Sequence, residues 1–205
     1  VLTTFHFFVE DMLVSSLQYV ISENHRICEN LCYAGGAALN IKWNSALRSK
    51  LGMKVWVPPF PNDSGSSIGA LCSAIRTYTQ QSTMKWNVYA GPDIVGTEMK
   101  KVPDNWLSLE YSLASLAKIL FYLQKPIVFL NGKAEIGPRA LGNRSILACA
   151  TTTEMKSKIN QIKFRENYRP IAPVCLEEYA ELVINPGSKD PYMLFDHEVR
   201  PEWLH

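Results

Sequence analysis

A pair of glycines between a short apolar run and a helical segment constrains the fold more than any other feature of this sequence. The run from Leu31 to Ala34 reads as a strand that ends at Gly35 and Gly36, and AALNIKWNSALRSK follows with helical spacing. Residues 55–57 predict a second strand. Strand, glycines and helix can bring backbone N–H groups to a phosphate, although a double glycine is equally typical of a plain tight turn. The order of strand, helix and strand predicts an α/β fold.

Periodicity predicts the remaining elements. Apolar residues at helical spacing predict a helix over residues 5–25, packed on a sheet through Phe8, Met12, Leu13, Leu17, Val20 and Ile21. Other helices are expected at 71–78, 108–124, 153–162 (with Thr153 as its cap) and 176–183, and strands at 127–131 and 145–150. Because residues 80–107 lose this periodicity, we predict a linker at 86–107 between domains at 1–85 and 108–205.

The composition limits the class of protein. With 205 residues and 47% apolar side chains, the chain can bury a sizeable core. A pI near 8.3 is too low to argue for DNA binding, so a nucleic-acid partner is disfavoured. Glu10 and Asp11 interrupt the apolar N-terminal residues, and no later stretch reaches the ~18 apolar residues of a membrane span. Neither a signal peptide nor a membrane association is therefore predicted.

The cysteines indicate a reducing compartment. The chain has five of them, with no CxxC pair and no zinc-binding spacing, and an odd count fits poorly with a secreted disulfide framework. We expect reduced, mostly buried thiols in a cytoplasmic protein. Since the chain begins with Val1 and ends on the loop-like PEWLH, both ends are expected to be cut.

Positive charge is concentrated between Gly132 and Pro173. From Lys133 to Arg169 this stretch holds eight basic residues against three acids, a balance of +5 in a chain whose total is +2. Glycines and prolines within it fix turns and let a ligand approach the backbone closely. The concentration of charge predicts a site for an anion. The basic residues are Lys133, Arg139, Arg144, Lys156, Lys158, Lys163, Arg165 and Arg169.

The segment KFRENYRP, residues 163–170, alternates in the manner of a strand. Lys163 and Arg165, with Arg169 as a further candidate, would then project from one face. Arginine forks and a lysine point charge suit a phosphate or a mixed anhydride of a carboxyl group and phosphate.

A second candidate site follows the predicted strand at 55–57. Asp63 lies there on the proline-stiffened loop PPFPNDSGSSIGAL. A carboxylate just after a strand end is where α/β folds place metal or nucleotide contacts. From spacing alone, an N-cap for the following helix is an equal alternative.

Four motifs together resemble one family. EIGPRALGNRSILA, followed by IN-x2-KFRE-x2-RPIAP, resembles the second domain of the O-carbamoyltransferases of nodulation-factor and antibiotic biosynthesis. AGGAALN and PPFPNDSGSSIGA resemble the end of that family's first domain, which belongs to the actin/sugar-kinase ATPase class. The resemblance implies part of an actin/sugar-kinase-like lobe, followed by a partial α+β domain that forms carbamoyl-adenylate.

The resemblance also implies substrates and residues for the second domain. Such enzymes use carbamoyl phosphate and ATP to make carbamoyl-adenylate there, and transfer the carbamoyl group to a hydroxyl acceptor in the first domain. Lys163 and Arg169 would be the leading contacts to carbamoyl phosphate or the adenylate, with Arg139 beside them. Arg144 and Arg165 are further candidates for substrate binding, although each could equally pair with Glu135 or Glu166.

For the first domain, the resemblance implies that Gly35, Gly36 and Asn40 face the nucleotide phosphates. Asp63 would be one ligand of a divalent metal of the iron or magnesium type. The partner would be a small-molecule hydroxyl acceptor, and a homodimer is allowed. A His-x3-His motif supplies the family's other metal ligands, and it does not occur in this sequence. We therefore expect the middle part of a carbamoyltransferase, inactive in isolation.

Three other interpretations stay open. The first is a tRNA threonylcarbamoylation enzyme, which the fused order of the motifs disfavours. The second is a non-catalytic module that holds single-stranded RNA between the cations and aromatics of residues 163–169. The third treats the basic residues as scattered surface ion pairs, which contribute little.

Overall fold

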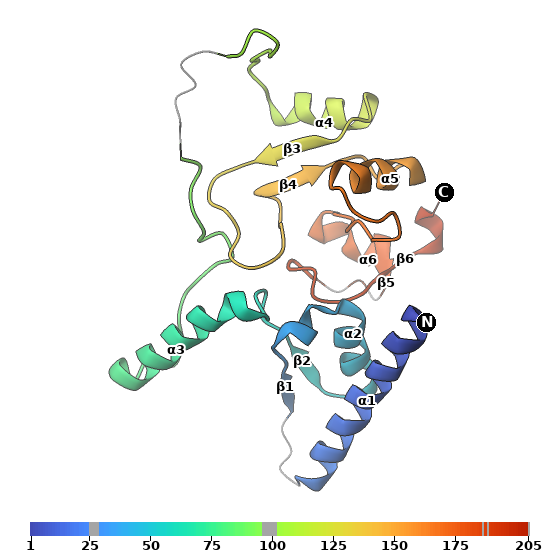
Figure 1. Ribbon diagram of the computed structural model, residues 1–205. Helices are drawn as coiled ribbons and strands as arrows, with labels where there is room; N and C mark the ends of the chain where they lie inside the picture. Colours follow the sequence, from blue (N-terminus) through green and yellow to red (C-terminus); the bar gives the residue numbers. More distant parts are fainter. Residues whose placement is uncertain (25–28, 96–101, 186, 188, 205) are drawn as a thin grey trace. The chain divides into compact units, whose positions relative to one another are not determined.

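The computed structural model describes residues 1–24, 29–95, 102–185, 187 and 189–204. Contacts divide the chain into two compact units. Unit 1 comprises Val1–Trp86, Ile136–Arg139 and Cys175–His205, and unit 2 comprises Asn87–Glu135 and Ala140–Val174. Helices and small two-stranded sheets occur in both units (Figure 1), which confirms the α/β class. The predicted linker at 86–107 and the domain limits 1–85 and 108–205 stay predictions.

Unit 1 is built around a parallel strand pair. β1 (Asn30–Cys32) pairs with β2 (Lys54–Trp56), with Leu31 opposite Val55. The 3-10 helix η1 (Gly36–Leu39) and helix α2 (Ile41–Lys50) connect them, as a parallel pair requires a crossover. The single helix predicted after the glycines is therefore wrong. Asn40 interrupts it in an extended conformation, because its side chain caps α2.

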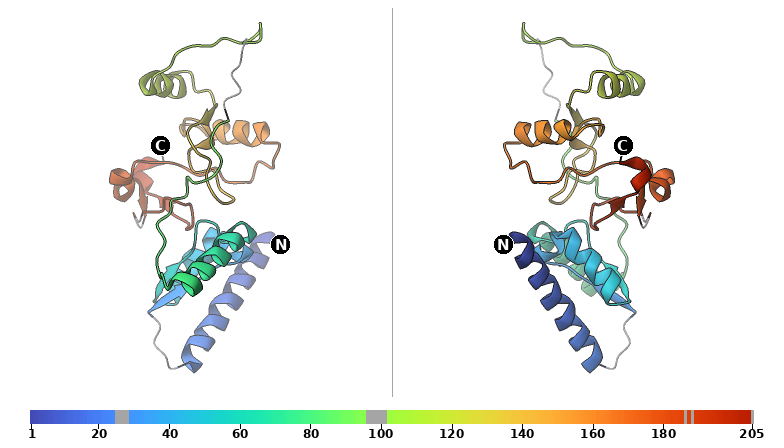
Figure 2. Two further views of the ribbon diagram at one scale, coloured as in Figure 1. Left: turned by 90° about the vertical axis from the view of Figure 1, so that its left-hand side faces the viewer. Right: turned by 90° about the vertical axis from the view of Figure 1, so that its right-hand side faces the viewer.

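Helix α1 (Leu2–Glu23) packs against α2, and the two lie side by side in both views of Figure 2. Val14 is buried in the core, and Leu13 and Leu17 pack against that core. The predicted buried face is only partly right, because Phe8 and Met12 stay 62% and 53% exposed. Apolar side chains occur on every side of this helix, so their spacing does not single out one face.

The C-terminal segment of the chain completes unit 1. Leu194 is buried in one cluster with Leu47, Val55 and Val57. Asn44 is fully buried beside it, and its amide donates to the carbonyls of Ala38 at 2.9 Å and Leu194 at 2.8 Å. The remaining elements of unit 1 are η2 (Asp63–Gly65), α3 (Ser66–Thr79), η3 (Glu177–Tyr179), α6 (Ala180–Val183), β5 (Ile184–Asn185), β6 (Glu198–Val199) and η4 (Pro201–Trp203). β5 and β6 are antiparallel.

Unit 2 holds an antiparallel pair and two helices. β3 (Ile127–Leu130) pairs with β4 (Arg144–Leu147), and α4 (Leu113–Tyr122) and α5 (Thr153–Ile162) flank them in the sequence. α4 begins five residues later than predicted because Ser112 and Ser115 form a capping box. The cap of α5 is Thr152 rather than Thr153, since the hydroxyl of Thr152 accepts from the N–H of Met155 at 3.3 Å.

Residues 163–170 are not a strand, contrary to the prediction. The N–H of Phe164 donates to the carbonyl of Gln161, and the N–H of Arg165 donates to that of Asn160, both at 3.0 Å. With Phe164 at a φ of +50°, this pair of bonds is a Schellman motif that ends α5. The basic segment is therefore a turn and loop, and its cations do not share a strand face.

Four cysteines lie in the described part of the chain, and all are free thiols. Cys32, Cys72 and Cys175 are exposed and Cys149 is half-buried, so the expectation of mostly buried thiols is wrong for them. Cys28 lies outside the described residues. Among the described helices, none combines the length and the hydropathy that crossing a membrane demands.

Candidate functional site

The double glycine forms a tight connection in unit 1. Gly35 has a φ of +108°, a conformation that favours glycine, and its N–H donates to the carbonyl of Pro61 at 2.7 Å. Its own carbonyl accepts from the N–H of the fully buried Ala38 at 3.0 Å. The amide of Gly35 is thus used within the protein, and Gly36 begins the four-residue helix η1. The role of both glycines beside a nucleotide stays a prediction.

Arg139 lies against this glycine turn. Its Nη2 donates to the carbonyl of Leu39 at 2.8 Å. Two residues earlier, Gly137 has a φ of +107°, and a Cβ there would lie 3.1 Å from the carbonyl oxygen of Pro59. Three of the sequence motifs therefore meet within unit 1: the glycine turn, the proline-rich loop and the first half of GPRALGN. The predicted place of Arg139 beside Lys163 and Arg169 joins the two units and stays a prediction.

Two opposing effects act on the charge of Arg139. Burial lowers the pKa of its guanidinium, and the negative charge of Asp190 opposes that shift. Asp190 is itself well held, because its carboxylate accepts from the N–H groups of Leu194 and Phe195, both at 2.9 Å. Within the described residues, the buried Nε of Arg139 has no hydrogen-bond partner.

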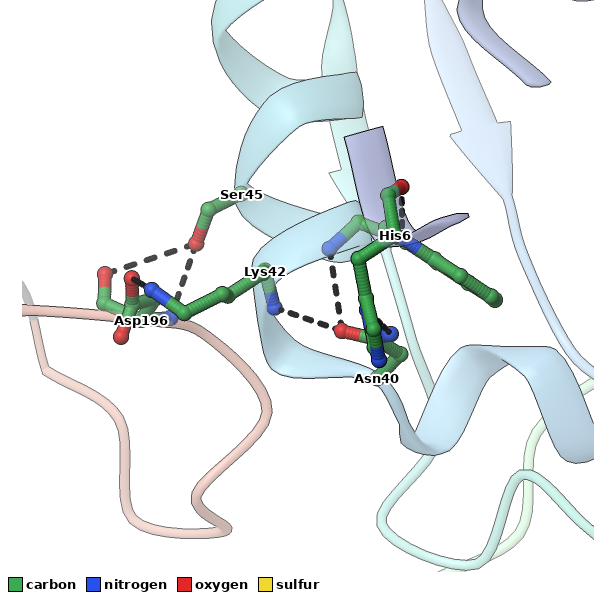
Figure 3. Close-up of polar contacts among 6 residues, drawn as sticks. His6, Asn40, Lys42, Ser45 and Asp196 are labelled. Carbon is green, nitrogen blue, oxygen red and sulfur yellow. Dashed lines mark hydrogen bonds and ion pairs between the residues drawn. The ribbon is translucent and has the colours of Figure 1, made fainter. Parts of the chain in front are cut away.

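Asn40 is occupied by the helix that it caps (Figure 3). Its Oδ1 accepts from the N–H groups of Lys42 at 3.1 Å and Trp43 at 3.4 Å. Its Nδ2 lies 3.3 Å from Nδ1 of His6. Beside it, the ammonium of Lys42 lies 2.8 Å from the carboxylate of Asp196. The side chain of Asn40 is thus engaged in capping, and its predicted contact with a nucleotide stays a prediction.

Asp63 is exposed at the start of η2. The residues that cap η2 and α3 are Asn62 and Gly65, so the N-cap alternative for Asp63 is wrong. No described residue forms a hydrogen bond or ion pair with its carboxylate, which is therefore accessible to a cation.

A complete metal site is not present in this part of the chain. Among the residues described, no three His, Cys, Asp or Glu side chains gather closely enough to hold a metal ion. One accessible carboxylate cannot hold a divalent ion by itself, since such ions take several oxygen ligands. The described residues therefore do not fit a bound metal on their own.

In unit 2, Glu135 and Arg144 hold the loop between β3 and β4. Oε1 of Glu135 accepts from the N–H groups of Leu141 at 2.7 Å, Asn143 at 2.8 Å and Arg144 at 3.3 Å. The guanidinium of Arg144 donates to four backbone carbonyls, those of Asn131 (3.0 Å), Gly132 (2.9 Å), Asn143 (2.8 Å) and Pro92 (3.3 Å). A guanidinium has five N–H donors, so Arg144 has few donors left to bind a substrate.

The pKa of Glu135 reflects these bonds. Burial alone would raise the pKa of its carboxyl, but the hydrogen bonds from backbone N–H groups of Leu141, Asn143 and Arg144 favour the ionised form. The net effect is a pKa below the ordinary value of 4.5. The ionised carboxylate is therefore the form that stabilises the loop.

The cations of residues 163–169 differ in what they contact. Nε of Arg165 donates to Oδ1 of Asn160 at 2.6 Å, and Nη2 donates to the carbonyl of Pro170 at 3.1 Å. Arg169 lies 3.9 Å from Glu166, with both side chains more than half exposed. Lys163 is exposed, and within the described residues its ammonium forms no hydrogen bond or ion pair. Lys163 and Arg169 are thus accessible, whereas Arg165 is bound into its own loop.

An open depression of about 710 Å³ lies beside this loop in unit 2. Its lining combines two cations, Lys158 and Arg165, with the carboxylates of Glu154 and Glu166. Such a mixed lining suits a ligand with both charged and neutral parts better than a bare anion. The lining residues are Glu154, Ser157, Lys158, Gln161, Arg165, Glu166 and Asn167.

Two family models match the two ends of the chain. The model described as carbamoyltransferase N-terminus matches residues 1–72, and that described as carbamoyltransferase C-terminus matches residues 119–205. The chain belongs to the carbamoyltransferase family.

Individual relatives agree with this. Nodulation protein U of Rhizobium tropici is 52% identical over 206 residues, which cover 99% of this chain and 35% of the relative. The 3'-hydroxymethylcephem-O-carbamoyltransferase of Streptomyces clavuligerus is 40% identical over 174 residues, or 84% of this chain and 33% of the relative. The chain therefore spans about a third of the length of the curated relatives that it matches.

Several residues that shape the loops cannot be identified from the sequence alone. The sequence presents Glu135 only as a possible ion-pair partner, and the structure shows it bound to backbone N–H groups instead. Nothing in the composition or charge marks Asn44 and Asn160, although both are fully buried polar residues. The available signal was a polar residue on the apolar side of a helix, as in KINQIKF, where Asn160 follows the buried Ile159.

Glu135 should make the stability of unit 2 depend on pH. Because its pKa is depressed in the folded state, its contribution is fully present above the ordinary value of 4.5 and is lost as pH falls through the lower folded value. Urea unfolding midpoints measured across this range should fall more steeply for the wild type than for Glu135→Gln, whose amide does not titrate. Equal slopes for the two proteins would contradict the assigned role of the carboxylate.

Proposed function

We propose that the protein carrying this chain is an O-carbamoyltransferase, which activates carbamoyl phosphate with ATP and transfers the carbamoyl group to a hydroxyl of a sugar or natural-product acceptor. One observation carries the proposal. Lys163 and Arg169 present accessible cations on a loop that is fixed by hydrogen bonds, while the neighbouring guanidiniums of Arg144 and Arg165 are engaged with the protein. The name of the cephem relative, an O-carbamoyltransferase, supports the same reaction class.

Activation would occur at the loop of residues 163–169. Carbamoyl phosphate, ATP and water give carbamoyl-adenylate, pyrophosphate and phosphate. Two anions must come together in this step, and fixed cations can offset their repulsion without reorganising. In this proposal, Lys163 and Arg169 contact the phosphate oxygens, and Arg165 keeps the loop in shape.

Transfer would occur in the other half of the protein, at an actin/sugar-kinase-like lobe to which unit 1 contributes. The acceptor hydroxyl attacks the carbamoyl carbon, the bond to AMP breaks, and the hydroxyl proton is lost. Gly35, Gly36 and Asn40 would line the nucleotide side of this site. Asp63 would lie in this site as an accessible carboxylate, although one carboxylate cannot hold a divalent ion by itself.

Substitution of the accessible cations tests the activation step. In the natural gene product, Lys163→Ala or Arg169→Ala should reduce carbamoyl phosphate-dependent pyrophosphate release by about 100-fold or more, because each removes charge stabilisation from the reacting anions. Thermal unfolding should change little, since exposed cations contribute little to stability. Lys156→Ala, an exposed cation on α5 outside the loop, is the matched control and should retain activity. Near-normal release by both loop variants would remove this loop from the activation site.

Substitution of Asp63 distinguishes the activation step from the transfer step. Asp63→Asn should leave pyrophosphate release close to the wild-type rate but reduce carbamoylation of the acceptor, because the carboxylate serves transfer and not activation. Both steps can be measured in one reaction, as pyrophosphate and as carbamoylated product. A parallel loss of both would contradict the assignment of Asp63 to the transfer site.

A second candidate function rests on two exposed aromatics. Phe164 and Tyr168 are 98% and 71% exposed, and they alternate with Lys163, Arg165 and Arg169. Exposed aromatics between cations can stack with the bases of single-stranded RNA. RNA affinity would fall steeply as salt rises, in proportion to the phosphates contacted. Saturable binding of carbamoyl phosphate without RNA affinity would instead favour the transferase.

A further inference from the structure

Asn160 is the most completely buried polar residue of α5, one turn before the basic loop. We propose that Asn160 is a positioning residue for activation, which sets the shape of the loop that presents Lys163 and Arg169. The inference rests on the proposed function, because it assigns to Asn160 a part in the same reaction.

Four hydrogen bonds connect Asn160 to this loop. Its Nδ2 donates to the carbonyls of Asn167 at 3.3 Å and Arg169 at 3.0 Å. Its Oδ1 accepts from Nε of Arg165 at 2.6 Å, and its backbone carbonyl accepts from the N–H of Arg165 at 3.0 Å. One residue thus binds both the beginning and the end of the segment 165–169.

These bonds fix the accessible cations indirectly. The bond to the carbonyl of Arg169 places the backbone from which that guanidinium extends. The Schellman motif fixes the backbone of Lys163, the C-cap of α5. It also gives the next residue, Phe164, a φ of +50°, which is costly for a bulky side chain. Because the loop holds a conformation that its own residues disfavour, an external anchor is needed, and Asn160 provides it.

An amide side chain can make all of the side-chain hydrogen bonds that this loop requires. Two carbonyls require a donor and a guanidinium requires an acceptor, and an asparagine side chain offers both in a small volume. Met155 and Ile159 are buried on the same helix. An apolar residue at 160 would serve packing equally well, but it would leave these loop groups unpaired.

Asn160→Asp is the most informative variant. It keeps the shape and the acceptor for Arg165, but replaces the donor to Asn167 and Arg169 with a second oxygen. In the natural gene product, kcat/KM for carbamoyl phosphate should fall by about 100-fold, the loss that a displacement of about 1 Å can produce. Ile159→Val, which trims a buried side chain of α5 while keeping all four hydrogen bonds, is the matched control and should stay near the wild-type value.

A mutant cycle distinguishes positioning from a general loss of structure. If Asn160 acts by positioning Lys163 and Arg169, then adding Asn160→Asp to the variant that carries both Lys163→Ala and Arg169→Ala should cause no further loss. A further multiplicative loss in that background would overturn the proposal.

Amide hydrogen exchange gives a readout that does not depend on the reaction. Without substrates, the amides of Arg165 and Arg169 should exchange at least tenfold faster in Asn160→Asp than in the wild type, and Ile159→Val should not change them. Unchanged exchange would overturn the proposal. If the wild type forms no carbamoyl-adenylate while exchange accelerates as expected, the proposed function fails but the anchoring of the loop by Asn160 stands.

Discussion

The loops that carry the candidate residues depend on hydrogen bonds between polar side chains and the backbone. In unit 1 the buried amide of Asn44 joins the turn after the double glycine to the C-terminal segment. In unit 2 the amide of Asn160 holds the basic loop, and Glu135 holds the loop between β3 and β4. Each of these bonds gives a backbone group of an irregular segment a partner within the protein, so replacing the side chain removes that partner. Irregular segments without their own ladder of bonds can be kept in one conformation in this way.

Because some side chains are engaged in these hydrogen bonds and others are not, the cations of the basic stretch are not equivalent. The guanidinium of Arg144 donates to four backbone carbonyls, and that of Arg165 donates to the side chain of Asn160 and to the carbonyl of Pro170. Lys163 and Arg169 remain accessible. Fixed charges stabilise a developing anion most effectively when the backbone that carries them does not move.

The sequence predicted the order of the elements better than their limits. β1, β2, α3, β3, β4 and α5 lie close to where apolar spacing and glycine or proline placed them. The misses have local causes that spacing does not reveal. Asn40 and Ser112 begin helices through side-chain caps, and residues 163–170 have a strand-like alternation but follow a helix end that places Phe164 at a positive φ. The candidate cations could be named from charge and motif, but only three-dimensional contacts separated the accessible ones from the engaged ones.

The most direct test is mass-spectrometric detection of carbamoyl-adenylate after the natural gene product is incubated with ATP and carbamoyl phosphate but no acceptor. Without an acceptor the activated intermediate cannot be consumed by transfer. We predict a species with the mass of carbamoyl-adenylate, together with an equal amount of pyrophosphate and only when both substrates are present. Failure to form this species, with ATP left intact by a protein that binds carbamoyl phosphate, would contradict the assignment of the basic loop to carbamoyl activation.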